Sequence, residues 1–278
     1  MTEGSRQKRR LDALLAERGL FPSRSRAAAS VMAGEVCVGA ARRRAEKPGE
    51  MVQDDIELSV RERPRYVSRG GIKLANALAA TGVSVAARHA LDVGASTGGF
   101  TDCLLQHGAA QVIAVDVGYG ELDYGLRRDP RVRVLERTNA RALAPALLPA
   151  WSDGHEGLAD LASIDVSFIS LAKVLPAVLG CLATRFDLLA LVKPQFEVGR
   201  ERVGKGGVVR DPEHRRAALQ DVGLSALALD VAVLGFHPSG LPGPKGNIET
   251  FVWLTEPSRA GAAADAGQVA AMTHEVRP

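Results

Sequence analysis

Four charged side chains stand at positions where they could carry out chemistry: Lys73, Asp165, Lys193 and Glu249. Asp165 and Lys193 each end an apolar run, 161–164 and 188–192, that reads as a buried strand. A charge there is costly unless it is paired, and ligands bind beyond the carboxyl ends of parallel strands. The pattern predicts a site with Asp165 and Lys193 or a structural ion pair. For Lys73 and Glu249, the pattern alone favours a solvated surface.

The segment 90–102, ALDVGASTGGFTD, predicts a strand that runs into a glycine-rich turn and then a helix. Such a turn lets a ligand approach bare backbone. Asp116 closes the next apolar run, VIAVD, near the offset at which an acidic side chain receives a ribose hydroxyl. Ser96 replaces the middle glycine of G-x-G-x-x-G, which disfavours a dinucleotide. Asp92 matches the acidic residue of many S-adenosylmethionine (SAM) loops, so we expect a nucleoside-containing cofactor.

The elements that must position these residues alternate between strand and helix over most of the chain. We expect strands at 90–94, 112–117, 132–137, 161–168, 186–193, 229–236 and 248–254, with helical patterns between most of them. This alternation predicts an α/β fold with a parallel, doubly wound sheet. Only a Gly/Pro-rich loop separates the last two strands, so we expect them to pair as a hairpin. Seven strands with a terminal hairpin are typical of a Rossmann-like SAM-dependent methyltransferase.

The first 60 residues predict a separate small unit of mixed helices and strands. Residues 1–71 contain 15 Lys and Arg against 10 Asp and Glu, whereas the remainder has 20 against 22. The basic excess favours a polyanionic partner. The order L-x-x-R-G-L, S-R-S-R, G-x-V-x-V-x-G resembles the S4-type RNA-binding module. The resemblance implies that basic side chains here contact RNA phosphates: Arg10, Arg24, Arg26, Arg42, Arg43 and Arg44.

The 278 residues suit one medium domain plus a small one. We expect an RNA-binding domain over 1–60, a linker over 61–67, a methyltransferase domain over 68–256 and a flexible tail over 257–278. The three cysteines are scattered without metal-ligand spacing, so we expect no metal and a cytoplasmic protein. No apolar run approaches the roughly 20 residues of a membrane span.

Seven motifs, in order, resemble the TlyA family: SRGGIKL, LDVGASTGGFTD, DVGYGELD, IDVSFISL, LVKPQFEVG, GKGGVVRDP and GNIE. Those proteins are SAM-dependent ribosomal RNA 2′-O-methyltransferases, often named haemolysins. The resemblance implies cytidine targets in 23S and in some members 16S rRNA, and a Lys-Asp-Lys-Glu tetrad at Lys73, Asp165, Lys193 and Glu249. The linker sequence PRYV, 64–67, departs from the Arg-x-aromatic-Val of some members, which leaves any linker-based coupling open.

The resemblance also assigns roles. For the cofactor, the methionine part would contact Gly94, Ser96, Gly98, Gly99 and Phe100, and Asp116 would hold the ribose. Asp92 would bind the methionine amine or brace the loop, and Asn139 would lie near the adenine or cap a helix. Arg69 would contact RNA. Lys193 would position and deprotonate the ribose hydroxyl, which requires a lowered lysine pKa. Burial and Lys73 favour that shift, and the two carboxylates oppose it.

Three other functions remain as alternatives. A pore-forming haemolysin would need a membrane-inserting segment, which is not visible in the sequence. A non-catalytic ribosome-binding protein would not need the tetrad. A small-molecule methyltransferase would not need a basic N-terminal module. We expect ribosomal RNA or ribosomal subunits as the partner, no membrane, and a monomer.

Overall fold

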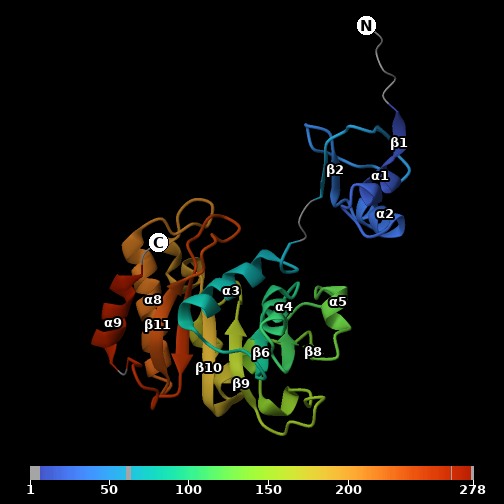
Figure 1. Ribbon diagram of the computed structural model, residues 1–278. Coiled ribbons are helices and arrows are strands. Elements are labelled where there is room, and N and C mark those ends of the chain that lie inside the picture. The colour runs from blue at the N-terminus through green and yellow to red at the C-terminus, as the bar shows by residue number, and fades with distance from the viewer. Residues whose placement is uncertain (1–6, 61–63, 264, 277–278) are drawn as a thin grey trace. The chain divides into compact units, whose positions relative to one another are not determined.

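The computed structural model describes residues 7–60, 64–263 and 265–276. The chain divides into two compact units, Met1–Pro64 and Arg65–Pro278 (Figure 1). Each unit has its own buried core, so each is described by itself.

The small unit combines two helices with two small sheets. Its elements are β1 (Lys8–Arg10), α1 (Leu11–Glu17), α2 (Arg24–Met32), β2 (Val36–Val38), β3 (Arg43–Arg44), β4 (Met51–Gln53) and β5 (Leu58–Val60). The sheets have the orders β1-β4 and β3-β2-β5. Ser23 caps α2 by accepting a hydrogen bond from the Arg26 amide at 3.2 Å. Leucines of α1 pack on Ala27, Val31 and the valines of β2 to form the core.

A seven-stranded sheet forms the centre of the large unit. Its strands are β6 (His89–Val93), β7 (Gln111–Val115), β8 (Val132–Leu135), β9 (Ala159–Ile164), β10 (Leu182–Val192), β11 (Ala232–Pro238) and β12 (Thr250–Thr255). The order is β11-β12-β10-β9-β6-β7-β8, and β12 runs antiparallel to both of its neighbours. The predicted α/β fold, the seven strands and the terminal hairpin are confirmed.

Helices cover both faces of this sheet (Figure 1). They are α3 (Arg69–Thr81), α4 (Gly99–Gln106), α5 (Tyr124–Arg127), α6 (Leu175–Leu179), α7 (Pro194–Glu197), α8 (Pro212–Leu227) and α9 (Ala266–Glu275), with short 3-10 turns η1 (Ala140–Ala142), η2 (Pro145–Leu147), η3 (Leu171–Lys173) and η4 (Arg200–Arg202). Side chains of α3 and α4 share one core with Leu189 and Leu191, and side chains of α6, α8 and α9 share the other with Leu188 and Ala190. Alternate residues of β10 thus face opposite cores, which explains its continuous apolar run.

Two expectations about the ends of the large unit are corrected. Residues 266–275 form α9, where we expected a flexible tail over 257–278. Val269 is buried against α8, where a Cβ added to Gly223 would meet the Val269 Cγ1 at 2.6 Å. Gly223 of α8 has no side chain and therefore lets Val269 of α9 pack closely against it. At the other end Tyr66 is buried in the core, so the expected linker, 61–67, is shorter on its C-terminal side; residues 61–63 lie outside the described part.

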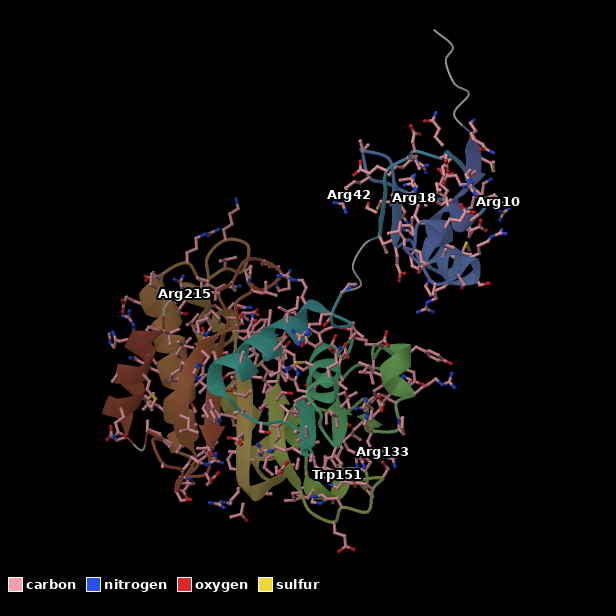
Figure 2. The ribbon with its side chains drawn as sticks, viewed as in Figure 1. Arg10, Arg18, Arg42, Arg133, Trp151 and Arg215 are labelled. Carbon is pink, nitrogen blue, oxygen red and sulfur yellow. The ribbon has the colours of Figure 1, made fainter. Side chains whose placement is uncertain are left out.

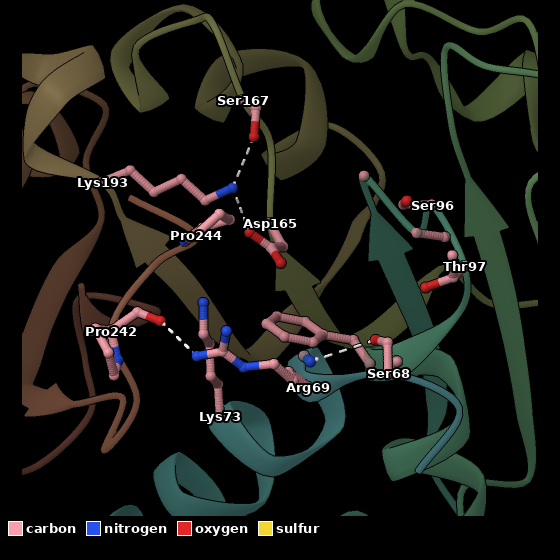
Figure 3. Close-up of a pocket in the computed structure, with 15 residues that line it drawn as sticks. Ser68, Arg69, Lys73, Ser96, Thr97, Asp165, Ser167, Lys193, Pro242 and Pro244 are labelled. Carbon is pink, nitrogen blue, oxygen red and sulfur yellow. Dashed lines mark hydrogen bonds and ion pairs between the residues drawn. The ribbon is translucent and has the colours of Figure 1, made fainter. Parts of the chain in front are cut away.

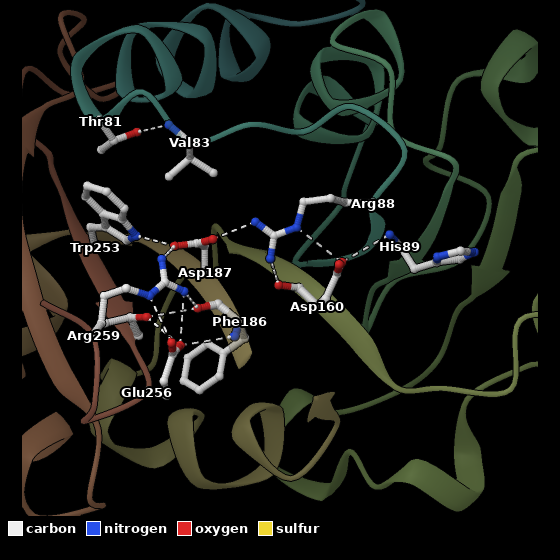
Figure 4. Close-up of polar contacts among 11 residues, drawn as sticks. Thr81, Val83, Arg88, His89, Asp160, Phe186, Asp187, Trp253, Glu256 and Arg259 are labelled. Carbon is white, nitrogen blue, oxygen red and sulfur yellow. Dashed lines mark hydrogen bonds and ion pairs between the residues drawn. The ribbon is translucent and has the colours of Figure 1, made fainter. Parts of the chain in front are cut away.

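A network of ion pairs holds the edge of the sheet where the parallel strands begin (Figure 4). Asp187 of β10 lies 2.5 Å from Nη1 of Arg88 and 3.3 Å from Nη1 of Arg259, and it accepts a hydrogen bond from Trp253. The Nε of Arg259 in turn lies 2.9 Å from Oε1 of Glu256. The hydrogen bond from Arg259 lowers the pKa of the Glu256 carboxyl to about 2. This edge is stabilised by paired charges, and the opposite edge carries the four residues predicted for chemistry.

Candidate active site

Strand register brings three of the four predicted charged residues to one edge of the sheet. Asp165 follows the end of β9 and Lys193 follows the end of β10, and these strands are parallel. The antiparallel β12 pairs its first residue, Thr250, with Val192. Glu249 therefore precedes β12 at the edge where Lys193 follows β10. Glu249, which precedes β12, lies at the same edge as Asp165 and Lys193, which follow β9 and β10, because β12 runs in the opposite direction.

Lys73 completes the group from α3, and the four charges form two ion pairs. The Lys73 ammonium contacts Oε2 of Glu249, and their side chains are only 9% and 1% exposed. The Lys193 Nζ lies 2.7 Å from Oδ1 of Asp165 and donates a hydrogen bond of 2.8 Å to the Ser167 hydroxyl (Figure 3). The solvated-surface alternative for Lys73 and Glu249 is therefore wrong, because both are buried.

Three contiguous cavities surround this group. The first, of about 450 Å³, is lined by all four charged residues and is called the Lys193 cavity. The second, of about 470 Å³, lies at the ends of β6 and β7 and is called the Asp116 cavity. A third, of about 440 Å³, shares Lys73 and Lys193 with the first and Gly94 and Ser96 with the second (Figure 3). Asp165 and Ser167 line all three.

The glycine-rich turn shapes the wall between β6 and the Asp116 cavity. Gly94 has φ +87°, and a Cβ there would meet the Asp165 carbonyl oxygen at 2.6 Å, so only glycine fits. The carboxylate of Asp116 accepts hydrogen bonds from the amides of Ser96 at 2.8 Å and Gly118 at 2.7 Å. These bonds fix the carboxylate at the cavity wall, where its remaining lone pairs can accept from a ligand hydroxyl.

The other predicted cofactor residues divide into two groups. Gly99 and Phe100 line the third cavity, and Asn139 lines the Asp116 cavity while also capping η1 through the Arg141 amide at 3.0 Å. Gly98 and Asp92 line none of the three. Gly98, at φ +95°, instead begins α4, where a Cβ would meet Leu126 at 2.4 Å.

The Asp92 side chain supports the glycine-rich turn through hydrogen bonds within the protein. Its carboxylate is fully buried and accepts hydrogen bonds from the hydroxyls of Thr101 at 2.7 Å and Ser163 at 3.1 Å. Burial raises the pKa of Asp92 to about 7, although both hydroxyls act in the opposite direction. These bonds join β6 to α4 and β9, which supports the bracing role over a direct contact with a ligand amine.

The raised pKa of Asp92 predicts a pH dependence of stability. An unfolded chain ionises Asp92 near its ordinary value of 3.8, whereas the folded chain keeps the proton up to about pH 7. The neutral Asp92 carboxyl makes its full contribution to the free energy of unfolding below about pH 4, and this contribution is lost as the pH rises to about 7. Relative to Asp92→Asn, the wild type should lose on the order of 3 kcal/mol of unfolding free energy between pH 5 and pH 8. Urea denaturation measures this difference.

The exposed Asp230 provides a control for that experiment. It has φ +57°, a conformation that asparagine tolerates, so Asp230→Asn should follow the wild type at every pH. If the free energies of unfolding of Asp92→Asn and the wild type change equally with pH, the raised pKa of Asp92 is contradicted.

Sequence reasoning missed several polar and aromatic residues of these cavities. Ser167 holds Lys193, and Phe168 is 91% exposed with φ +65° at the boundary of the Asp116 and Lys193 cavities. Asn247 joins two loops by accepting from the Val209 amide at 2.9 Å and donating to the Gly207 carbonyl at 2.8 Å. Polar residues directly after strand ends were the available signal, since these positions lie at the ligand-binding edge.

The predicted RNA-contacting arginines of the small unit are all exposed: Arg10, Arg24, Arg26, Arg42, Arg43 and Arg44. Arg10 and Arg24 share the carboxylate of the buried Asp12, at 2.8 and 3.4 Å (Figure 2 labels Arg10 and Arg42). Asp12 thereby holds two guanidinium groups in place at the surface of α1 and α2. In the large unit Arg69 donates to the Pro242 carbonyl at 2.9 Å and lines the third cavity.

Comparison with known proteins identifies both units. Residues 66–256, which include the four charged residues, match the FtsJ-like methyltransferase family, and residues 9–55 match the S4 domain. The 16S/23S rRNA (cytidine-2'-O)-methyltransferase TlyA of Mycobacterium tuberculosis is 50% identical over 255 residues, covering 90% of this chain and 91% of that protein. The chain belongs to the TlyA family. The TlyA-family resemblance predicted from its motifs is therefore confirmed.

Other TlyA-like proteins extend the comparison. Hemolysin A of Brachyspira hyodysenteriae is 37% identical over 240 residues, covering 86% of this chain and 97% of that protein. A solved structure from Streptococcus thermophilus has 42% identity and a TM-score of 0.67, covering 98% of this chain and 97% of that one. Within the described ranges, no helix has the length and apolar character needed to cross a membrane.

Proposed function

We propose that this protein transfers a methyl group from SAM to the ribose 2′-hydroxyl of a cytidine in ribosomal RNA. The ion pairs Lys73–Glu249 and Lys193–Asp165 line one cavity. The observation that carries the proposal is that Asp165 also lines the neighbouring cavity, which is walled by Gly94 and Asp116. The name of the Mycobacterium tuberculosis relative, a 16S/23S rRNA (cytidine-2'-O)-methyltransferase, supports the substrate.

The Asp116 cavity fits the cofactor. The carboxylate of Asp116, held by two backbone amides, would accept from the ribose hydroxyls. Gly94 and Ser96 would hold the methionine part toward the third cavity, and Asn139 would lie beside the adenine. When bound, SAM supplies an electrophilic methyl group on a sulfonium. Asp165 and Ser167 border both this cavity and the Lys193 cavity, so the methyl group and the ribose would meet beside them.

Lys193 and Asp165 would act on the ribose hydroxyl as a pair. The Lys193 side chain, held by Asp165 and Ser167, would fix the 2′-oxygen in line with the methyl carbon. In that transfer the 2′-oxygen would gain the methyl group, and the electrons of the broken carbon–sulfur bond would remain on the sulfur of the donor. The hydroxyl proton would pass to the Nζ of Lys193 in its neutral amine form, and Asp165 would stabilise the ammonium that results. Lys73, oriented by Glu249, would stabilise the negative charge that develops on the oxygen.

The small unit would supply RNA affinity through phosphate contacts. Arg26 and Arg42 are exposed. Each phosphate that the protein neutralises adds about 0.9 to the magnitude of the slope of the logarithm of the binding constant against the logarithm of the salt concentration. Arg26→Ala combined with Arg42→Gly should weaken binding to ribosomal subunits and reduce that slope by about 2, while SAM binding stays unchanged. Gly is used because φ is +50° at residue 42. Filter binding at several salt concentrations measures the slope.

Arg185→Ala is the matched control for this experiment, because Arg185 is exposed in the large unit at the start of β10, away from the site. An equal loss per removed charge in Arg185→Ala and in the double variant would show that only overall charge matters and would contradict phosphate contacts by the small unit. Because the proposed substrate is the ribosome, we also propose a cytoplasmic location.

The direct test is methyl transfer from labelled SAM to isolated small and large ribosomal subunits, followed by mapping of the modified nucleotide. We expect a 2′-O-methylcytidine in 23S rRNA, 16S rRNA or both. A parallel haemolysis assay examines the activity that the name of the Brachyspira relative suggests. Lysis of red cells without labelled RNA would overturn the proposal.

A further inference from the structure

Gln195 lies two residues beyond Lys193, on a short helix that is firmly held. Lys193 is the N-cap of α7, and the buried Pro194 is its first residue. Glu197, at the other end of α7, accepts a hydrogen bond from the Leu171 amide at 2.9 Å. The helix is thus fixed both to β10 and to η3. The position of Gln195 relative to Lys193 is therefore set by the backbone.

The Gln195 side chain has a buried polar atom without a partner. Its Oε1 is buried and has no hydrogen bond to any group in the part of the chain that the structure describes. The residue lines the Lys193 cavity. A buried acceptor left unpaired is costly, so native proteins rarely keep one unless a ligand or water satisfies it.

The side-chain amide of Asn247, in contrast to that of Gln195, has hydrogen-bond partners. It lines the same cavity, but backbone groups of residues 207 and 209 satisfy both its amide oxygen and its amide nitrogen. Asn247 has a structural role, whereas the amide oxygen of Gln195 has no such partner in the described part of the chain.

We infer that Gln195 reads the base of the nucleotide whose ribose is methylated, and that it selects cytosine. This inference rests on the proposed function, because it needs the 2′-hydroxyl to lie at Lys193. Lys193 and Gln195 line the same cavity, so a nucleotide whose ribose lies at Lys193 would share that cavity with Gln195. The base would then enter the Lys193 cavity beside Gln195.

The chemistry of the amide matches the Watson–Crick edge of cytosine. Cytosine presents its exocyclic amino group as a donor and N3 as the neighbouring acceptor. The Gln195 oxygen would accept from the amino group, and the Gln195 amide nitrogen would donate to N3. Uracil presents an acceptor and a donor in the reverse order, so both contacts are lost when the amide keeps this orientation. Gln195 is accordingly a specificity residue, and the reaction itself stays with the lysines.

The test compares wild-type protein with Gln195→Leu, which keeps the approximate size of the side chain and removes both polar groups. The substrates are ribosomal subunits with cytidine or uridine at the mapped position. Wild type should prefer cytidine, and Gln195→Leu should lower kcat/KM for cytidine by roughly tenfold to a hundredfold while uridine changes little. The KM for SAM should not change. Gln195→Glu, which keeps the acceptor but loses the donor, should give an intermediate ratio.

Gln220→Leu is the matched control, since Gln220 lies on α8 and bonds to Thr273, outside the Lys193 cavity. It should keep the cytidine preference of the wild type. An unchanged preference in Gln195→Leu and Gln195→Glu would overturn the inference and leave the proposed function intact. Failure of the wild type to methylate either substrate would instead overturn the proposed function itself.

Discussion

Replacing Lys193 with Ala is expected to slow methyl transfer by about a hundredfold to ten-thousandfold, the range that positioned proton-transfer groups contribute. The reason is geometric. Lys193 Nζ is held by Asp165 at 2.7 Å and Ser167 at 2.8 Å at the junction of the cavities. Its removal leaves no Lys193 Nζ to hold the ribose oxygen in line with the methyl carbon. Single-turnover transfer from labelled SAM to ribosomal subunits measures the chemical step.

SAM binding should largely survive this substitution, because the contacts proposed for the SAM ribose and adenine, at Asp116 and Asn139, lie in a cavity that Lys193 does not line. Calorimetric titration with SAM checks that point. Lys173→Ala is the matched control: it removes an exposed lysine from η3 in the same unit and should leave the rate unchanged. If Lys193→Ala retains the wild-type rate while Lys173→Ala does too, the assignment of proton transfer to the Lys193–Asp165 pair is wrong.

Replacing Glu249 with Ala is expected to have the largest effect on stability. Its carboxylate is the ion-pair partner of Lys73, and the two side chains are 1% and 9% exposed. The variant leaves the Lys73 charge buried and unpaired, which costs about 3–5 kcal/mol. Urea denaturation should show this loss as a lower midpoint with an unchanged slope.

A double variant separates the buried charge from the lost packing. Lys73→Met combined with Glu249→Leu removes both charges and roughly preserves volume, so its stability should return close to that of the wild type. Its methyl transfer should nevertheless stay impaired, since the ammonium group of Lys73 is no longer present to stabilise the charge on the ribose oxygen. Equal stability of Glu249→Ala and the wild type would show that the pair contributes nothing to folding.

Much of the architecture could be predicted from the sequence because it depends on local patterns. Buried strands such as 188–192 are continuous apolar runs, and a Gly/Pro-rich loop between 238 and 249 indicates a hairpin. The tetrad could be predicted because its motifs are specific. Helix α9 could not, since its small residues resemble a disordered tail and only the contact between Val269 and Gly223 shows that the segment packs.

The rest of the site depends on partners distant in sequence. One of the hydrogen bonds that Asp92 accepts comes from Ser163, 71 residues away. The burial of Lys73 is decided by Glu249, 176 residues away. Nothing next to Gln195 in the sequence indicates that its oxygen is unpaired, because that is a property of the whole cavity wall. Such contacts become visible only when strands and helices are placed in three dimensions.

The shared wall formed by Asp165 and Ser167 has a kinetic consequence. Both residues border the cavity proposed for SAM and the cavity proposed for the nucleotide. When two ligands contact the same side chains, the binding free energy of each depends on the presence of the other, and this dependence is reciprocal. The two substrates of such an enzyme do not have independent Michaelis constants. Coupled release, with the spent donor and the methylated RNA each affecting the departure of the other, then follows from the position of Asp165 and Ser167.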